Sequence, residues 1–409
     1  MARREHDFVV VGGGPVGAVM ALGLEAQGHD VALVERNGPP QKVEAGPKIA
    51  KGLNVDARTV ALSLASRRLL EQYDAWPNKR IGAFTHMEVW EDRGTSVLRF
   101  GATDVAQDAL GHIAEVGPWL AQLWQRLERS TVTCVVGRSV TGVSSEAGGY
   151  SLDLSSNQDP KDDPEDDPGE PLLARMLIAA DGARSVVRRE LGVPMPLVDT
   201  GQSALAFAAR VENHHEHTAF QRFLAEGPLA LLPMADPNIV SIVWSARNDR
   251  ADELAGMSLK QLKVALERAS ELRLGRIEEA TAAVRFPLHQ GVISNFCPRP
   301  NVVLIGDAAR VIHPLAGQGV NLGFEDVRAL LDCTEATPPE GLKRFARVRR
   351  ARSNLAVAAM SALSAGYANQ SPVPLLARNV LTRALGRSEM ARKALVMEAL
   401  GLGPVAKAS

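Results

Sequence analysis

The chain has few cysteines and almost no net charge, and each shortage argues against a class of protein. Its 409 residues include only three cysteines, Cys134, Cys297 and Cys333, with no close pairing. This pattern disfavours a disulfide framework and favours a reducing compartment. The formal net charge of −1 argues against a general electrostatic grip on nucleic acid or anionic lipid.

Long apolar runs are missing as well. The most apolar late stretch, residues 355–365, is shorter than the ~20 apolar residues that a bilayer-spanning helix needs. The N-terminal residues run into a strand pattern without a cleavable apolar region. We therefore expect a soluble protein, or one peripheral to a membrane. A hydrophobic content of 45% and a charged content of 23% are ordinary for such a protein, and its length suggests two or three domains.

The N-terminus carries the pattern of a dinucleotide-binding unit. An apolar strand at residues 7–11 leads into the glycines of a GxGxxG motif, Gly12, Gly14 and Gly17. A helix is predicted from Pro15 to Gln27, and a second strand at residues 30–34 ends at Glu35, which would accept hydrogen bonds from an adenosine ribose. A plain glycine turn is the alternative, but both strands, the helix and the terminal acid favour the nucleotide.

A second stretch, residues 301–330, organises the rest of the chain. The apolar run Val302 to Ile305 predicts a buried strand, and Gly306-Asp307 places a carboxylate past its C-terminal end, where ligands bind in α/β sheets. A loop with His313, Pro314, Gly317 and Gly319 precedes a helix predicted to begin near Val320. A helix N-terminus offers free N–H groups and partial positive charge. A carboxylate for sugar hydroxyls beside donors for an anion suggests a reduced flavin.

Two further segments fit this ligand. Residues 172–179 predict a strand that ends in Ala180-Asp181-Gly182-Ala183-Arg184-Ser185, and two such strand ends can close over one extended ligand. Taken alone, Asp-Gly would indicate a β-turn. Arg58 precedes a helix predicted to start near Thr59. It is either a solvated arginine or a cation facing the cofactor's pyrophosphate.

The remaining segments carry weaker patterns. Residues 84–100 predict a β-hairpin around Gly94, and residues 111–129 a turn followed by a helix with a packed face of Trp119, Leu120, Leu123 and Leu127. Residues 131–140 and 150–154 predict strands, and the acidic, proline-rich residues 155–171 a mobile loop. Residues 204–286 predict an inserted sheet domain interrupted by a helix at 259–273.

Two clusters leave alternatives open. The spacing of His214, His215 and His217 has no clear fourth partner, so a solvated loop is favoured over a metal site. After residue 340 the chain is helical, basic in its first half and apolar in its second. A packed helix is favoured there over a membrane-surface or partner helix.

With these motifs in order, the chain resembles the ubiquinone-biosynthesis hydroxylases, within the group A flavin-dependent aromatic monooxygenases. The resemblance covers nearly the whole chain. It is carried by GGGPVG, DARTVAL, LGHIAE, ADGARSVVR, GPLALLPM, SIVWS, GDAA and HPLAGQGVNLGFED. It implies an α/β fold with a Rossmann-like FAD-binding domain interleaved with a β-sheet substrate domain, plus C-terminal helices.

The resemblance also implies roles for single residues. Gly12, Gly14, Gly17, Glu35, Arg36 and Arg58 would bind the ADP half of FAD. Gly306 and Asp307 would take the ribityl chain, and Gly317, Gly319, Val320 and Asn321 would face the pyrimidine edge of the flavin. Asp181, Gly182 and Arg184 would contact FAD and NAD(P)H. His313 and Pro314 would be the catalytic residues, with Pro314 between flavin and substrate; no metal is implied.

Six segments are implied: FAD-binding parts at 1–75, 106–190 and 287–340, substrate-domain parts at 76–105 and 191–286, and a C-terminal helical segment at 341–409. The implied reaction is hydroxylation of a lipophilic aromatic ring by NAD(P)H and O2 through a flavin C4a-hydroperoxide. The substrate would be a polyprenyl phenol or quinol. The protein would be cytoplasmic, with attachment to the inner membrane, a lipid carrier or a biosynthetic complex left open, and no nucleic acid as partner.

The alternatives are a hydroxylase of a small soluble aromatic and a non-catalytic FAD-bearing scaffold. A flavin halogenase is disfavoured, because no WxWxIP segment occurs among the five tryptophans. Three positions depart from the family pattern. Arg310 stands where histidine is common, Glu325 where arginine or an apolar residue is usual, and Leu120 where a glutamine usually contacts the flavin.

Overall fold

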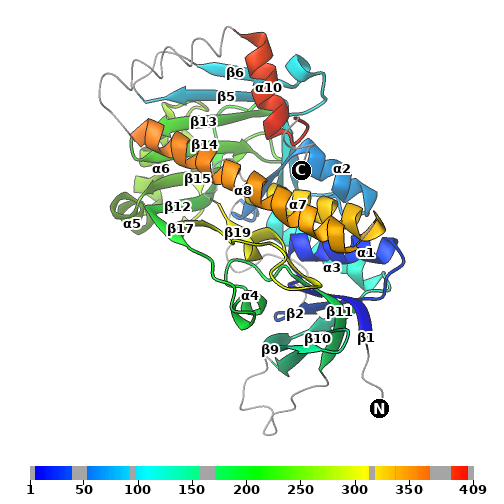
Figure 1. The fold of residues 1–409 in the computed structure, drawn as a ribbon. Coiled ribbons are helices and arrows are strands. Elements are labelled where there is room, and N and C mark those ends of the chain that lie inside the picture. The colour runs from blue at the N-terminus through cyan, green and yellow to red at the C-terminus, as the bar shows by residue number, and fades with distance from the viewer. Residues whose placement is uncertain are drawn as a thin grey trace.

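The computed structural model describes residues 5–38, 53–92, 97–156, 171–312, 318–336, 338–368 and 388–403. These residues form a seven-stranded, a nine-stranded and a three-stranded sheet, with helices packed against them (Figure 1). A parallel Rossmann-like sheet beside a large mixed sheet confirms the predicted α/β fold class. The six predicted segment boundaries remain a prediction.

The seven-stranded sheet carries the N-terminal motif. Its order is β8-β2-β1-β11-β10-β9, with β18 also paired to β11. The strands are β1 (Glu5–Val11), β2 (Val31–Glu35), β8 (Thr133–Val136), β9 (Arg138–Glu146), β10 (Gly149–Ser156), β11 (Leu172–Ala179) and β18 (Val302–Leu304). Neighbours from β8 through β2, β1 and β11 to β18 are parallel, so their carboxyl ends share one edge.

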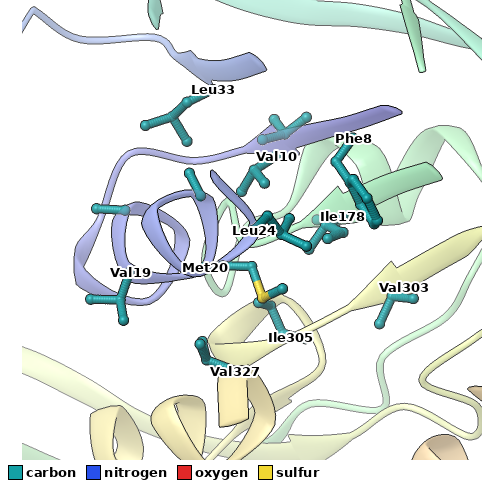
Figure 2. Close-up of a cluster of buried hydrophobic side chains, with 14 of the residues drawn as sticks. Phe8, Val10, Val19, Met20, Leu24, Leu33, Ile178, Val303, Ile305 and Val327 are labelled. Carbon is teal, nitrogen blue, oxygen red and sulfur yellow. The ribbon is translucent and has the colours of Figure 1, made fainter. Parts of the chain in front are cut away.

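Helices α1 (Pro15–Ala26), α3 (Val116–Glu128) and α7 (Gln318–Ala336) enclose the core of this sheet. Figure 2 shows part of this core, where side chains of β1, β11 and β18 meet side chains of α1 and α7. They are Phe8, Val10, Ile178, Val303, Met20, Leu24 and Val327. Burying one such side chain contributes roughly 1.5–3 kcal/mol, so the strand ends stand on a rigid base.

The nine-stranded sheet runs β19-β17-β12-β15-β14-β13-β5-β6, with β16 paired to β12. Its strands are β5 (His86–Glu91), β6 (Leu98–Gly101), β12 (Val198–Val211), β13 (Thr218–Leu224), β14 (Gly227–Pro233), β15 (Ile239–Arg247), β16 (Ile277–Ala280), β17 (Val284–Val292) and β19 (Arg310–Val311). Helices α5 (Asn248–Gly256) and α6 (Leu259–Ser270) share its core. Because β18 and β19 are close in sequence, residues 302–311 pass from one large sheet to the other.

The three-stranded sheet corrects two predictions. It consists of β3 (Thr59–Leu62), β7 (Gly111–Glu115) and β4 (Ile81–Phe84), with β7 in the middle. The helix predicted near Thr59 begins instead at Leu64, as α2 (Leu64–Gln72), where the Ser63 hydroxyl caps it. The turn predicted at 111 is β7. Both errors arise because pairing between distant segments overrides local preference.

Among the other predicted elements, some are confirmed and some are corrected. β5 and β6 form the predicted hairpin, whereas Gly94 lies outside the described residues. The strand predicted at 131–140 is two strands, because Gly137 has a φ of 73° between them. Helix α5 was not predicted. Most of the acidic loop predicted at 155–171 lies outside the described residues.

The C-terminal helix α8 (Pro338–Ala368) packs along α7 and crosses the molecule toward the second sheet (Figure 1). Its buried residues recur on one face, as expected for a packed helix: Leu342, Phe345, Arg349, Ser353, Ala356 and Met360. Helix α10 (Glu389–Ala399) shares an apolar cluster with α2, β6 and η1 (Ala102–Val105). Within the described ranges, no helix is long and apolar enough to cross a membrane.

Candidate functional site

The parallel strands end in one row. Val34 pairs with Val11, Val11 with Ala179, and Ala179 with Leu304. The residues that follow this row therefore emerge side by side at one edge of the sheet. They include Gly12, Glu35, Asp181 and Asp307, so segments far apart in sequence meet at the edge where ligands bind in α/β sheets.

The glycine turn between β1 and α1 is fixed by close backbone approach. Gly12 has a φ of 109°, and a Cβ there would lie 2.4 Å from the Ala180 carbonyl oxygen. A Cβ on Gly17 would lie 1.9 Å from the Gly12 carbonyl oxygen. In contrast, a Cβ on Gly14, the N-cap of α1, would have no heavy atom of the described residues within 4 Å. Two glycines thus permit the fold, and the third leaves the helix N-terminus open to a phosphate.

Glu35 lies at the end of β2, beside this turn. Its carboxylate accepts the Gly13 N–H at 2.6 Å and the Asn37 N–H at 2.9 Å. A carboxylate offers about four acceptor positions, so roughly two remain for sugar hydroxyls. Arg36, the next residue, is exposed.

The Gly306-Asp307 turn forms the 3₁₀ segment η2 (Gly306–Ala308), with Gly306 at a φ of 58°. The Asp307 carboxylate faces the start of α7, because its Oδ1 lies 4.0 Å from where a Cβ on Gly319 would stand. Asp307 is exposed, although surrounding protein atoms raise the pKa of its carboxyl. Arg310 opposes this rise of the pKa, whereas the Asp326 carboxylate adds to it.

Asp181 has a structural task that the sequence did not reveal. Its Oδ2 accepts the N–H groups of Val186 and Val187, at 2.7 and 3.3 Å, at the start of α4 (Val186–Glu190). Its Oδ1 is buried and has no hydrogen-bond partner in the part of the chain that the structure describes, and burial raises the pKa of the carboxyl. Gly182 takes a φ of 82°, and Arg184 is exposed.

Arg188 joins the two later strand ends. Its buried guanidinium donates to the Ala308 carbonyl at 3.0 Å and to the Ala183 carbonyl at 2.9 Å. Burial lowers the pKa of Arg188. Sequence reasoning gave this arginine no role of its own, although it lies within ADGARSVVR.

Arg58 lies near the start of α3. Its side chain is 66% exposed and its Nη2 lies 3.4 Å from Asp56 Oδ2. The same carboxylate accepts the Gly117 N–H at 2.9 Å. Buried Glu115, a residue not singled out from the sequence, fixes this segment by accepting the Asp56 N–H at 2.8 Å and Arg80 Nη1 at 3.0 Å.

The start of α7 is pinned by its own side chain. Asn321 Oδ1 accepts the Ser63 N–H and the Ser66 hydroxyl, and its amide donates to the Ala61 carbonyl. Asn321 therefore fixes the helix start against β3 and α2. Val320 packs on the core. The predicted residues His313, Pro314 and Gly317 lie outside the described residues.

This edge fits a dinucleotide with a sugar-linked ring: an open helix N-terminus, a ribose acid, a second acid and a second helix start. A family model described as "FAD binding domain" matches residues 5–358. The chain belongs to this family. It is an FAD-dependent aromatic hydroxylase of the ubiquinone-hydroxylase group; FAD is its cofactor, and NAD(P)H is typical of the family.

Curated relatives resemble it over most of its length. It is 31% identical to the 3-demethoxyubiquinol 3-hydroxylase of Escherichia coli, over 98% of this chain and 100% of that protein. It is 32% identical to the mouse ubiquinone biosynthesis monooxygenase COQ6, over 80% of this chain and 75% of that protein. Identity to the ubiquinone hydroxylase UbiL of Rhodospirillum rubrum is 28%, over 98% and 92%.

Solved structures support the fold. The p-nitrophenol 4-monooxygenase PnpA of Pseudomonas putida superposes with a TM-score of 0.75 at 18% identity, covering 99% of this chain and 100% of that one. PqsL of Pseudomonas aeruginosa superposes with a TM-score of 0.74 at 20% identity, covering 93% and 100%. At these identities the likeness concerns the fold alone.

The structure explains two of the departures from the family pattern. In this monooxygenase Arg310 and Glu325 are both buried and belong to one group of charges, connected through Asp326 and Arg349. Asp326 accepts Arg310 Nη1 at 2.6 Å, and Arg349 of α8 donates to Asp326 and to Glu325. Each unusual charge is therefore compensated within the fold.

The third departure concerns Leu120, which stands where the family usually has a glutamine. Leu120 packs on the core, and Gln122 holds the segment before β4, donating to the Trp76 carbonyl at 2.7 Å and accepting the Asn78 N–H at 3.1 Å. In this monooxygenase neither residue substitutes visibly for the glutamine of the family pattern.

The histidine cluster needs one correction. His215 is buried rather than solvated, with Nε2 3.2 Å from the Met234 carbonyl and 3.1 Å from the Asp236 carbonyl, and burial lowers its pKa. Its backbone-directed hydrogen bonds account for it as a turn residue. In the part of the chain that the structure describes, no group of three or more histidine, cysteine or acidic side chains could hold a metal.

Proposed function

We propose that this monooxygenase hydroxylates the ring of a lipophilic polyprenyl phenol or quinol in ubiquinone biosynthesis, using NAD(P)H and O2. The observation that carries the proposal is the similarity to the E. coli 3-demethoxyubiquinol 3-hydroxylase, which runs through 98% of this chain and all of that protein. A likeness confined to the cofactor domain would leave the substrate open. Here the likeness includes the nine-stranded sheet, which would form the substrate domain.

Different residues at the sheet edge would bind different parts of FAD and NAD(P)H. We assign Gly12, Gly14, Gly17, Glu35, Arg36 and Arg58 to the ADP half of FAD. Gly306 and Asp307 would hold the ribityl chain, and Gly319, Val320 and Asn321, with Gly317, would donate to the flavin's pyrimidine edge. Asp181, Gly182 and Arg184 would lie between FAD and NAD(P)H.

FAD, when bound, supplies the oxygen transfer, and the protein supplies binding, orientation and exclusion of water. The N-terminus of α7 would stabilise negative charge that develops on the ring nearby. Each ~1.4 kcal/mol of such stabilisation is worth about tenfold in rate. Pro314 and His313 would border the substrate, and no side chain is required as a nucleophile.

A lipophilic substrate has to reach this site from a membrane. The outward face of α8 carries Lys343, Arg347 and Arg350, which line a groove of about 570 Å³ together with Cys297 and Asn354. Near an anionic surface each cation contributes about 1 kcal/mol. Although the net charge of the chain is near neutral, this local cationic face would contact either an anionic membrane or a lipid-carrying partner in a biosynthetic complex. The protein would then be cytoplasmic and peripheral to the inner membrane.

The test compares two substrates that differ only in the tail. The FAD-loaded enzyme receives NAD(P)H, O2 and either a short-chain prenylphenol or the matched tailless phenol, and both hydroxylated product and consumed NAD(P)H are measured. We expect higher kcat/KM and tighter coupling with the tail. Equal values would assign the enzyme to small soluble aromatics. Failure of every phenol to stimulate NAD(P)H oxidation would favour a non-catalytic scaffold.

A further inference from the structure

Five charged side chains are grouped where α7, α8 and the Gly306 turn meet. Arg349 of α8 donates through Nε to Asp326 Oδ1 at 2.6 Å and through both Nη atoms to Glu325 Oε2 at 3.1 Å. Arg352 donates to the same Glu325, at 3.2 and 3.3 Å. Arg310 reaches Asp326 from the other side. The group thus links two helices and a strand.

The burial of these groups makes their pairing important. Arg349 and Asp326 are 0% exposed, and Arg310 is 2% exposed. Although burial lowers the pKa of Arg349, Asp326 and Glu325 raise it above its usual value, so the guanidinium stays charged. Removing one partner from such a buried pair leaves an uncompensated charge, which is far more costly than losing a surface pair.

Asp326 joins this group to the proposed flavin site. Its Oδ2 accepts the Gly306 N–H at 3.0 Å and Arg310 Nη1 at 2.6 Å. One carboxylate oxygen therefore grips the first residue of the turn and the residue four positions later. Asp307, the proposed ribityl ligand, lies between these two points.

The second oxygen of Asp326 fixes the orientation of the first. With Arg310 alone the carboxylate could rotate about its Cβ–Cγ bond and release the Gly306 N–H. Arg349 holds Oδ1, and Glu325 and the Leu322 carbonyl in turn hold Arg349. The contact between α8 and α7 is thus transmitted to a turn that α8 does not itself supply.

We infer that Arg349 is a positioning residue for FAD binding, which acts through Asp326 to hold the Gly306-Asp307 turn in its ligand-binding shape. The inference rests on the proposed placement of FAD at Asp307. It assigns the C-terminal helix a role in cofactor affinity, and it explains why an arginine at 310 and a glutamate at 325 occur together in this chain.

The test measures FAD affinity, by fluorescence titration of apoprotein, together with the melting temperature of the apoprotein. Arg349→Met should weaken FAD binding by about tenfold or more. Arg344→Met, at an exposed neighbour on α8, should leave FAD affinity unchanged. Arg349→Lys keeps a cation but not the two-sided grip, so its affinity should fall between wild type and Arg349→Met.

A purely structural role would give a different pattern. The double variant Glu325→Gln/Arg349→Met removes one charge of each sign, so the apoprotein should regain much of the lost melting temperature while FAD binding stays weak. If FAD affinity recovers together with the melting temperature, Arg349 only stabilises the fold and the inference is overturned. An unchanged FAD affinity in Arg349→Met would overturn it as well.

The route through Asp326 is tested by a double-mutant cycle. Asp326→Asn keeps an oxygen for the Gly306 N–H but loses the charge that Arg349 holds. Adding Arg349→Met to this variant should weaken FAD binding little further, and full additivity would contradict the route. Asp307→Ala separates the two proposals. If that variant binds FAD normally, the placement of FAD at Asp307 fails and this inference fails with it; if it binds weakly while Arg349→Met does not, only this inference fails.

Discussion

Two turns at the same sheet edge are held by different forces. The turn from β1 to α1 is shaped by excluded volume, since Gly12 and Gly17 leave no room for a Cβ. The turn after β18 is shaped by charge, since Asp326 holds the Gly306 N–H and is held by two arginines. The first turn is encoded by three glycines within six residues. The second depends on a helix that begins about thirty residues later.

This difference shows which kind of turn can be predicted from a local sequence motif. A steric turn needs particular residues at particular local spacings, so its motif is visible. A charge-held turn needs only compensation in space, which distant positions can supply. Arg310 and Glu325 therefore looked like isolated departures in the sequence, although they belong to one buried group.

The largest expected effect breaks the steric turn. Gly17→Ala places a Cβ 1.9 Å from the Gly12 carbonyl oxygen, within backbone that cannot move aside. We expect a loss of roughly 3 kcal/mol or more of unfolding free energy, measured by urea titration, together with loss of FAD binding. Gly14→Ala is the matched control, because its Cβ has free space. It should keep the stability of the apoprotein and weaken only FAD binding; equal destabilisation of the two variants would contradict this division.

A pH experiment tests a contribution to the stability of the whole fold that involves neither turn. His112 on β7 is buried, its Nδ1 has no hydrogen-bond partner among the described residues, and burial, aided by Arg67, lowers its pKa to about 4. The unfolded chain has a histidine pKa of about 6.5, so between these values only the unfolded state binds the proton. Stability should fall by about 3 kcal/mol as pH drops from 6.5 to 4.

His112→Phe keeps the edge-on ring contact with Trp76 without a titrating group, so it should flatten this part of the pH profile. The difference between the two proteins should be the same with and without FAD, because β7 belongs to neither turn. Parallel profiles for wild type and variant would show that His112 does not carry the effect.

Asp307→Ala probes the ligand at the charge-held turn. Sugar hydroxyls would lose a charged acceptor, and hydrogen bonds to charged groups contribute roughly 1.5–3 kcal/mol. FAD binding should therefore weaken by more than about tenfold, while the melting temperature of the apoprotein stays within a degree or two of wild type. Fluorescence titration measures the affinity, and an unchanged value would assign the carboxylate another task.

The smallest effect concerns a support of the steric turn. Trp124 of α3 donates its Nε1–H to the Gly13 carbonyl at 3.2 Å. Trp124→Phe removes this hydrogen bond but keeps an aromatic ring, so we expect a loss of about 1 kcal/mol and a several-fold weaker FAD affinity. A loss as large as that of Gly17→Ala would mean that contacts outside the glycines dominate the first turn.

The sequence predicted the elements that rest on local pattern: β1, α1, β2, β11 and β18 with their terminal acids. It mistook β3 for a helix start and β7 for a turn, because these short strands form by pairing with each other and with β4, which are distant in sequence. The sequence assigned no role to Gln122, whose side chain holds the Trp76–Asn78 segment. Tasks such as those of Asp181, Arg188 and Arg349 depend on burial and on partners that spacing does not reveal.

The order of strands in the seven-stranded sheet has a consequence for synthesis on the ribosome. Central strand β1 is synthesised well before its neighbour β11, which begins at Leu172. Strand β11 is in turn synthesised well before its neighbour β18, which begins at Val302. Asn321 closes a contact with Ser63 across 258 residues. Most of the polypeptide must therefore be made before its first strand is enclosed. We expect slow folding and a need for chaperone protection of β1 and β2, as is general for parallel sheets with distant pairings.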